Sequence, residues 1–283
     1  MSLKRQIIFK VMVYYCVICL PAWGQSANTV DQQKDLIIKV FNVGYGDAIL
    51  LIPPRSSPIL VDTGSEDHVH VIVDWLKEND VDHIGSLIIT HPHDDHFGGA
   101  LRLLDAVSFK KFYYNGDDQQ ADQGFDQLMA KIMESGIPVR VLKKDDRLSF
   151  KPDDFSITTL HPQTLDHSAN ENSMVLLLRY KEISVLLTAD IQPRQQLALL
   201  KIYPALAETD AVQIPHHGGR LDDSFARLMN NKIIFMSTGP NEYQKPYKEE
   251  IEKVSGRIFR TDLQGMITLT TNGYDIKVST ENE

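Results

Sequence analysis

Three histidines lie within six consecutive positions of the sequence, with an aspartate directly before the last of them. They form the motif His-x-His-x-Asp-His, which contains His91, His93, Asp95 and His96. Imidazole nitrogens and carboxylate oxygens are ligands that Zn²⁺ and Mn²⁺ accept, and both cysteines of the chain lie far away in the first 24 residues. The motif therefore predicts a site for divalent metal ions.

The spacing of the motif indicates how its side chains would divide between two ions. Alternate residues of an extended segment point to the same side, so His91 and His93 are expected to bind one ion together. Asp95 and His96 are then expected to face a second ion. The motif alone does not supply enough ligands for either ion, so other segments must contribute.

The elements that must position these residues are short apolar strands alternating with helices, and the motif directly follows one of the strands. Strands are expected at residues 36–41, 48–52, 59–61, 86–90, 139–142, 155–160, 174–180, 183–188, 211–214, 233–236, 258–260 and 266–270. Helices are expected at residues 69–76, 125–133, 194–202, 224–229 and 247–254. Hairpins mixed with crossing helices favour a layered α/β sandwich over a barrel of parallel strands.

The composition indicates a globular protein with an acidic surface. The chain has 283 residues, of which 42% are hydrophobic, and this is enough for a substantial core. No linker or repeat interrupts residues 35–280, which we expect to form one domain. With 29 basic and 38 acidic side chains the formal charge is −9, which excludes a protein that coats nucleic acid through a global positive field.

The N-terminal segment has the features of a secretory signal peptide. Three basic residues precede or border the apolar run of residues 11–20, and small residues precede a cleavage site near Gly24. The run is too short for a stable membrane span. We therefore expect residues 1–24 to be removed, residues 25–34 to form a short extension, and the protein to be secreted or periplasmic. The mature chain would lose three basic residues and carry a charge of −12, without cysteine.

The motif and three further segments resemble the metallo-β-lactamase superfamily and, within it, the ComEC-type hydrolase domain of competence proteins and its stand-alone relatives. The segments are Phe-Asn-Val-Gly-Tyr-Gly-Asp-Ala at 41–48, Ile-Leu-Val-Asp-Thr-Gly at 59–64 and Pro-His-His-Gly at 215–218. The resemblance extends over nearly all of residues 35–270. It implies a four-layer αββα sandwich.

The resemblance also implies which residues complete the metal sites. Asp190 ends a predicted strand, as the family's metal-bridging aspartate does, although it would also suit a helix N-cap before Pro193. The last ligand of the family follows a strand such as residues 211–214. We favour His217 as this ligand, and expect His216 to contact substrate or support a ligand.

The third ligand of the first metal ion is the least determined position. Relatives supply a histidine from the loop after a strand such as residues 155–160. His167 is the favoured candidate here because of its distance from the next strand, and His161 is a second candidate or a packed loop histidine. Members of the ComEC-type subgroup often have only asparagine and serine in this loop, as at Asn170, Asn172 and Ser173.

The resemblance implies a role for Asp62, whereas Lys245 departs from the family's pattern. Asp62 matches the aspartate that orients a ligand histidine by accepting its second ring proton, or else it forms a turn. Residues 237–246 resemble a subgroup loop in which Gln244 and Lys245 replace the usual glycine and histidine. Lys245 would offer a positive charge to an anionic substrate, or would be an exposed loop lysine.

Hydrolysis with two divalent ions is the expected activity, with Zn²⁺ favoured and Mn²⁺ as the alternative. The resemblance implies attack by a metal-bridging hydroxide, held by Asp95 or Asp190, on a phosphodiester of nucleic acid or of a cell-envelope component, with His216 near the substrate. Two alternatives are a carboxylic ester, thioester or lactam hydrolase on the same fold, and a non-catalytic envelope protein that retains the fold.

A direct sequence signal for nucleic acid is weak. Residues 110–114, Lys-Lys-Phe-Tyr-Tyr, would suit base stacking, but they also suit an ordinary strand with two exposed lysines. An anionic phosphoester is therefore the expected partner, nucleic acid is one candidate source of it, and the sequence leaves the oligomeric state open.

Overall fold

The computed structural model of this protein describes residues 34–150 and 154–282. The expected signal peptide, residues 1–24, and the extension up to residue 33 lie outside the described residues. None of the helices in the described ranges is long and apolar enough to cross a membrane.

Two large sheets contain most of the strands. The first sheet consists of β1 (Leu36–Val40), β2 (Ile49–Ile52), β3 (Ile59–Val61), β5 (Ser86–Ile89), β7 (Phe112–Tyr114), β8 (Val139–Val141), β16 (Ile267–Thr271) and β17 (Ile276–Thr280). The second consists of β9 (Arg147–Phe150), β10 (Phe155–His161), β11 (Val175–Tyr180), β12 (Ile183–Leu187), β13 (Ala211–Gln213), β14 (Ile233–Met236) and β15 (Ile258–Arg260). A small sheet pairs β4 (His83–Ile84) with β6 (Ser108–Phe109).

Each large sheet has an antiparallel half and a parallel half. The first sheet has the order β17-β16-β1-β2-β3-β5-β7-β8, and its pairing changes from antiparallel to parallel between β3 and β5. The second has the order β15-β14-β13-β12-β11-β10-β9, and its pairing changes between β12 and β13. Parallel neighbours require crossover connections, which here contain most of the helices.

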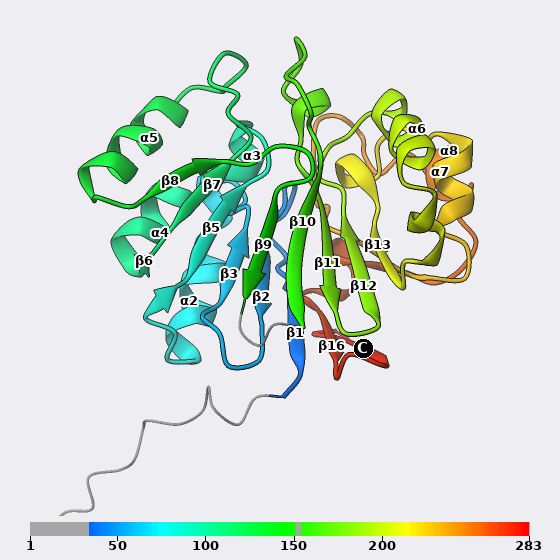
Figure 1. Ribbon diagram of the computed structural model, residues 1–283, viewed down its shortest axis with the longest axis horizontal. Helices are drawn as coiled ribbons and strands as arrows, with labels where there is room; N and C mark the ends of the chain where they lie inside the picture. Colours follow the sequence, from blue (N-terminus) through cyan, green and yellow to red (C-terminus); the bar gives the residue numbers. More distant parts are fainter. Residues whose placement is uncertain (1–33, 151–153, 283) are drawn as a thin grey trace, which may run out of the picture.

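Helices cover the outer face of each sheet, so the molecule has four layers (Figure 1). The first sheet is covered by α2 (His70–Glu78), α4 (Ala100–Ala106) and α5 (Phe125–Glu134), and the second by α6 (Pro193–Ile202), α7 (Asp223–Leu228) and α8 (Lys248–Ile251). Short helices in the connections are η1 (Glu66–His68), α3 (Asp94–Phe97), η2 (Asn170–Asn172), η3 (Pro204–Glu208), η4 (Pro215–His217) and α9 (Thr261–Gln264). The αββα sandwich predicted from the sequence is confirmed.

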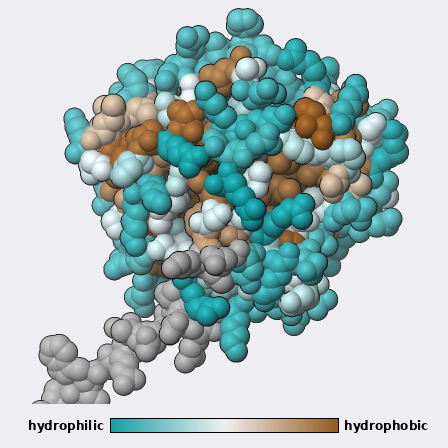
Figure 2. All heavy atoms as spheres, in the orientation of Figure 1, coloured by the Kyte–Doolittle hydropathy of each residue, from teal (hydrophilic) through white to brown (hydrophobic). Residues whose placement is uncertain are grey.

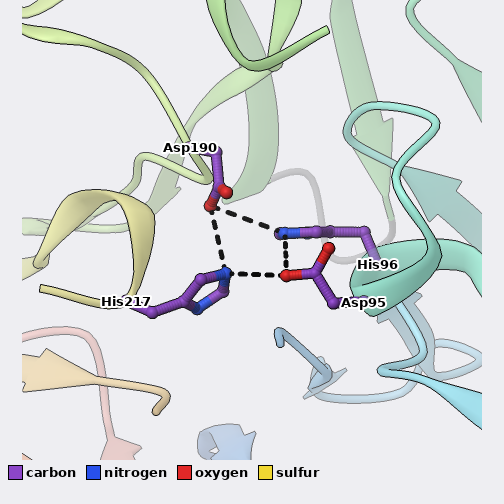
Figure 3. A group of neighbouring side chains, drawn as sticks. All are labelled: Asp95, His96, Asp190 and His217. Carbon is purple, nitrogen blue, oxygen red and sulfur yellow. Dashed lines mark ion pairs between the residues drawn. The ribbon is translucent and has the colours of Figure 1, made fainter. Parts of the chain in front are cut away.

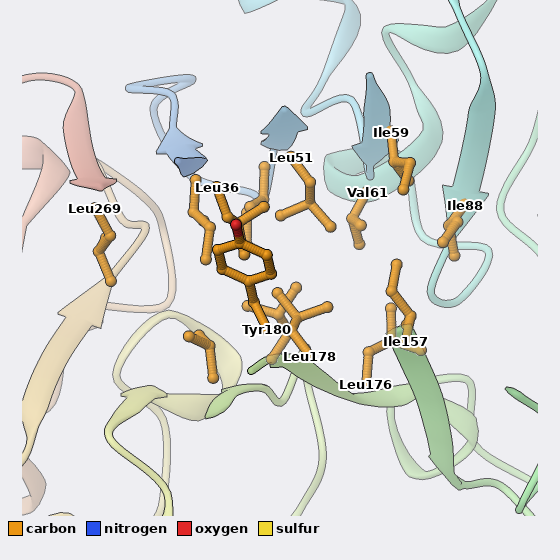
Figure 4. Close-up of a cluster of buried hydrophobic side chains, with 14 of the residues drawn as sticks. Leu36, Leu51, Ile59, Val61, Ile88, Ile157, Leu176, Leu178, Tyr180 and Leu269 are labelled. Carbon is orange, nitrogen blue, oxygen red and sulfur yellow. The ribbon is translucent and has the colours of Figure 1, made fainter. Parts of the chain in front are cut away.

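The alternation of side chains along each strand separates three apolar clusters. Ile49 and Leu51 of β2 point between the two sheets, where they pack with residues such as Leu178 of β11 (Figure 4). Leu50 points the other way, into the layer that contains Leu76 of α2. Because both faces of the central strands are buried, these strands are continuous apolar runs in the sequence.

The predicted and observed elements differ mainly at short or exposed strands. β9 and β17 were not predicted, because their residues alternate with exposed polar side chains at the edges of the sheets. Residues 112–114 form β7, and its three aromatic side chains are buried. They are part of the core and do not form a surface for base stacking. The face of the molecule seen in Figure 2 is mostly hydrophilic, with small hydrophobic areas.

Candidate metal centre

The predicted ligands follow strands at the junctions where the pairing of the sheets changes. The motif follows β5 and continues into α3, whose first turn is closed by hydrogen bonds from the backbone amides of His96 and Phe97 to the carbonyl of His93. Asp190 follows β12, and His217 follows β13. The two sheets therefore contribute ligands from opposite sides.

Asp95, His96, Asp190 and His217 form one compact group (Figure 3). The Nε2 atom of His96 lies 3.6 Å from Asp95 Oδ2 and 3.5 Å from Asp190 Oδ1. The Nε2 atom of His217 lies 3.2 Å and 3.3 Å from the same two oxygens. All four ligand atoms lie within 4.8 Å of one another, and the two histidines and Asp190 are buried. Two nitrogens and two oxygens thus converge on one point, as a divalent cation requires.

Both histidines of this group have their second ring nitrogen held by a hydrogen-bond acceptor. Nδ1 of His96 donates to Asp62 Oδ2 at 2.9 Å, and Nδ1 of His217 donates to the Ser237 carbonyl at 3.1 Å. These acceptors hold one ring proton on Nδ1, so each Nε2 faces the group and can bind a cation once its own proton is released. Nε2 of both rings and Asp190 Oδ1 are buried without a hydrogen-bond partner among the described residues, which fits a bound metal ion.

A second group lies on the other side of Asp190. Nε2 of His91 lies 3.1 Å from Nδ1 of His93 and 3.9 Å from Asp190 Oδ2. Nε2 of His216 lies 3.4 Å from the same carboxylate oxygen. The two oxygens of Asp190 thus face different sets of histidines, which is the arrangement that a carboxylate shared by two cations needs.

The loop after β10 does not bring His167 into either group. The His167 side chain is exposed and does not line the pocket at the site, whereas Asn170 does. The amide nitrogen of Asn170 lies 3.4 Å from His216 Nε2. His161 also points elsewhere, because its Nε2 donates to the Glu171 carbonyl at 2.7 Å. The placement of the loop therefore argues against the histidine chosen from the sequence and favours Asn170.

Asn172 explains why the loop turns in this way. It is fully buried, and its side-chain amide donates to Asp117 Oδ2 at 2.6 Å and to the Asp166 carbonyl at 3.0 Å. Its backbone carbonyl accepts from the Asn115 side chain at 2.9 Å. The hydrogen bonds of Asn172 thus fix the position of η2, and Asn170 at the start of η2 lies next to the site.

Burial and neighbouring charges shift the pKa values of the residues in this centre. Burial alone would lower the pKa of His217, but the carboxylates of Asp190 and Asp95 raise it to about 10. Burial and the neighbouring His96 hold the pKa of His91 well below its ordinary value. Burial would raise the pKa of Asp190, but the surrounding histidines hold it well below its ordinary value. Protons on the histidine rings thus offset the negative charge of the buried carboxylates, and a metal ion would compete with these protons for the ring nitrogens.

Asp47 is a site residue that the sequence analysis did not single out. It is buried, its Oδ2 accepts from Gln213 Nε2 at 2.8 Å, and its Oδ1 lies 3.8 Å from Nδ1 of His217. Burial raises the pKa of Asp47 to about 6. In the sequence, the signal that could have indicated Asp47 is the glycine that precedes it. The structure explains this glycine: Gly46 has φ of 129°, and a Cβ at this position would lie 2.3 Å from the carbonyl oxygen of Asp95.

A pocket of about 700 Å³ opens onto the two groups of ligands. Its lining includes His93, Asp95, Asp190 and His216, so a substrate in the pocket would reach the proposed metal ligands. Lys245 lines the same pocket, which places this loop lysine at the site and not on a remote surface.

The sequence profile of the metallo-β-lactamase superfamily matches residues 42–244. ComE operon protein 3 of Bacillus subtilis (strain 168) is 24% identical over 291 aligned positions, which cover 92% of this chain and 34% of that protein. The chain thus spans about a third of the length of this relative.

Solved structures with the same fold have lower sequence identity. YhfI, a metallo-β-lactamase fold protein from Bacillus subtilis, has a TM-score of 0.53 and 14% identity, with 83% of this chain and 100% of YhfI covered. The E377D mutant of the CmlA β-hydroxylase has a TM-score of 0.51 and 18% identity, with 83% of this chain and 54% of that chain covered. These similarities agree with the layers and topology described above.

Proposed function

This chain belongs to the metallo-β-lactamase superfamily and is ComEC-like within it, and from this premise we propose that it hydrolyses phosphodiester bonds with two divalent metal ions. The observation that carries the proposal is the convergence of Asp95, His96, Asp190 and His217, whose ligand atoms lie within 4.8 Å of one another. Nε2 of His96, Nε2 of His217 and Asp190 Oδ1 are buried without a hydrogen-bond partner among the described residues, which is otherwise costly, and a cation would satisfy them.

The two groups of side chains would hold one ion each. His91, His93 and Asp190 would bind the first ion, with His216 beside Asp190 and the Asn170 side chain beside His216. Asp95, His96, His217 and the other oxygen of Asp190 would bind the second. The ligands are nitrogen and oxygen only, so we propose Zn²⁺ as the ion, with Mn²⁺ as the alternative.

The residues of the site would have different roles in hydrolysis. Divalent ions in such a site supply Lewis acidity, which lowers the pKa of water and polarises a phosphoryl oxygen. Asp62 and the Ser237 carbonyl keep the Nε2 atoms of His96 and His217 aimed at the centre. Asp95 is the partly exposed carboxylate of its group, so it can accept a hydrogen bond from an attacking water and orient it.

The support for a phosphodiester as the substrate class is the charge of the pocket and the resemblance of the sequence to the ComEC-type hydrolase domain. A relative that aligns with 92% of this chain is ComE operon protein 3 of Bacillus subtilis. The pocket also contains a lysine, Lys245, in addition to its proposed metal ligands. A substrate with a negative charge at the scissile group is complementary to both.

A panel of chromogenic substrates tests this proposal. Purified protein loaded with Zn²⁺ or Mn²⁺ is expected to hydrolyse bis-p-nitrophenyl phosphate, and the His93→Ala variant is expected to lose this activity while its circular dichroism spectrum stays the same. Hydrolysis of nitrocefin or p-nitrophenyl acetate without hydrolysis of the phosphodiester would replace the proposal with an ester or lactam hydrolase.

We also propose that the protein acts outside the cytoplasm. The support is the sequence of residues 1–24, in which basic residues are followed by an apolar run and then by small residues. Mass spectrometry of the protein recovered from a cell-envelope fraction is expected to find an N-terminus near Gln25. An intact N-terminus on protein confined to the cytoplasm would contradict this.

A further inference from the structure

We propose that Lys245 and Tyr45 form an anion-binding subsite beside the metal centre and that this subsite selects substrates with a negatively charged scissile group. The inference deepens the proposed function and rests on it for the identity of the anion, a phosphodiester. The two residues come from distant segments, the loop after β14 and the loop between β1 and β2.

The Tyr45 ring contacts both the ammonium group of Lys245 and the proposed metal ligand His217. Lys245 Nζ lies 2.8 Å from the hydroxyl oxygen of Tyr45 and 5.4 Å from the centroid of its ring. The Tyr45 ring packs on His217, with 4.4 Å between ring centroids. The exposed ring of Tyr243 lies 5.3 Å from the same ammonium group and forms the outer side of the subsite.

The loop that carries Lys245 is held in place before any substrate arrives. The Asn241 side chain donates to the carbonyls of Gly239 and Lys245, at 2.8 and 2.7 Å, and accepts from the Lys245 amide at 3.1 Å. Gly239 packs against the loop of Tyr45, since a Cβ there would lie 2.5 Å from the backbone carbon of Gly44. A subsite fixed in this way loses little entropy when it binds an anion.

The hydrogen-bond donors of the pair are available to a ligand. Lys245 Nζ donates one of its three protons to Tyr45, and it forms no ion pair with a carboxylate among the described residues. The Tyr45 hydroxyl accepts this bond, so its own proton is free to donate. By contrast, the neighbouring Lys248 and Lys253 are paired with acidic side chains on the surface. Lys245 thus has unused donors inside the pocket that no carboxylate of the described residues occupies. Burial lowers its pKa, and the carboxylates of Asp190 and Asp95 oppose this effect.

The charge of the pocket explains why such a residue is needed. Lys245 is the only lysine or arginine in the described lining, whereas the acidic residues there are Asp94, Asp95, Asp122, Asp190 and Glu242. These carboxylates would repel an anion. Two divalent ions and Lys245 together would carry as many positive charges as these five residues carry negative ones. Anion binding at this subsite is therefore expected to require the bound metal.

Steady-state kinetics of the metal-loaded protein test the subsite. For Lys245→Met, which keeps the length and apolar stem of the side chain, we expect the KM for bis-p-nitrophenyl phosphate to rise about tenfold or more, as loss of a charge-assisted hydrogen bond predicts. The KM for neutral p-nitrophenyl acetate is expected to change less than about twofold. Lys245→Arg should restore most of the phosphodiester KM, and Tyr45→Phe should show a smaller increase. Lys248→Met is the control, because that lysine is exposed.

Two results of this experiment would overturn the subsite. One is a KM for the phosphodiester that is unchanged in Lys245→Met. The other is an equal change for both substrates, because this would indicate a general disturbance of the pocket without selection for charge.

Binding of inorganic phosphate separates this inference from the proposed function. Calorimetric titration of phosphate into metal-loaded wild-type protein and Lys245→Met, with metal content measured in both, is expected to show about tenfold weaker binding in the variant. If the wild-type protein hydrolyses no phosphodiester, the proposed function fails, and the phosphate titration still decides the subsite. Equal phosphate affinity at equal metal content would overturn it.

Discussion

Asp62 illustrates how a single side chain can control the metal centre without belonging to either group of ligands. Its carboxylate accepts hydrogen bonds from the backbone amide of Thr90 at 2.8 Å, from the Thr90 hydroxyl at 2.7 Å and from Nδ1 of His96 at 2.9 Å. These bonds keep the proton of His96 on Nδ1 and its Nε2 free for a cation. Removal of one acceptor would disturb the tautomer as well as the orientation of the ring.

Asp62→Asn is expected to lower metal affinity about 10- to 100-fold, as is usual when the hydrogen-bond partner of a ligand histidine is changed. The backbone at this position has φ of 59°, which asparagine tolerates, so the fold should be retained. Competition with a chromogenic chelator measures the effect. Asp82→Asn is a matched control, since Asp82 also accepts a hydrogen bond from a histidine but is exposed. Equal losses of affinity in both variants would contradict the role of Asp62.

Asn170 and His167 give a second comparison at the level of single residues. Asn170→Ala is expected to weaken binding of the ion next to His91 and His93, because Asn170 is the loop side chain beside that group. His167→Ala is expected to leave metal content unchanged, because its side chain is exposed. Elemental analysis after dialysis measures both. Loss of metal in His167→Ala alone would restore the ligand favoured by the sequence.

These residues mark the extent to which the site could be predicted from sequence. The motif was recognisable from its short spacing, and Asp190 and His217, after β12 and β13, were implied by the resemblance to a known family. The loop after β10 was different, since its path depends on Asn172 meeting Asp117, which is 55 positions away in the sequence. No local pattern reports such a contact, and Asp47 was missed because its partner Gln213 is even more remote, 166 positions away in the sequence.

At the scale of elements, the site depends on two loops that touch. The loop of Gly46 and Asp47 lies against the motif, and the backbone amide of Asp47 donates to the Asp95 carbonyl at 3.2 Å. The hydroxyl of Ser237, after β14, donates to the Gly46 carbonyl at 2.6 Å. The glycine at position 46 allows this approach, because any larger residue would collide with the backbone that carries Asp95.

Gly46→Ala is therefore expected to reduce both metal affinity and stability, by about 1–3 kcal/mol in the free energy of unfolding. Gly124→Ala is the control, because Gly124 also has a positive φ, 100°, but has open space around its Cα. Chemical denaturation and metal titration of both variants measure the difference. If Gly46→Ala loses no more stability and metal than Gly124→Ala, the close contact between the loops is unimportant.

The elements themselves were predictable where burial determines the sequence pattern. β3, β14 and β15 have the predicted bounds, because turn residues or polar segments flank their apolar runs. Helix α8 is shorter than the predicted residues 247–254, and it ends at Ile251. β17 has half-buried residues between exposed ones at the edge of its sheet, so its pairing with β16 had no strong hydrophobic signal.

At the scale of the whole molecule, the metal centre joins the two halves of the sandwich. The motif extends from the first sheet, whereas Asp190 and His217 follow strands of the second sheet. A cation bound by both sets would link the sheets in addition to the apolar core between them. Metal binding is therefore coupled to the stability of the fold.

Metal is expected to raise the unfolding temperature, and this effect should weaken as the pH falls. In the metal-free protein the pKa of His217 is about 10, so a proton occupies this ligand at neutral pH and competes with the ion. The difference in unfolding temperature between metal-loaded and chelator-treated protein should thus decrease from about pH 9 to about pH 6. A difference in unfolding temperature that stays constant over this pH range would show that the metal ion does not displace a proton from His217.

The central claim is that one pair of divalent ions is held where the motif meets Asp190 and His217. An anomalous-scattering map from crystals grown with Zn²⁺ tests it most directly. The account predicts two peaks, one within bonding distance of His96 and His217, the other next to His91 and His93, with Asp190 between them. Peaks only at surface histidines, with His96 and His217 free of metal, would contradict it.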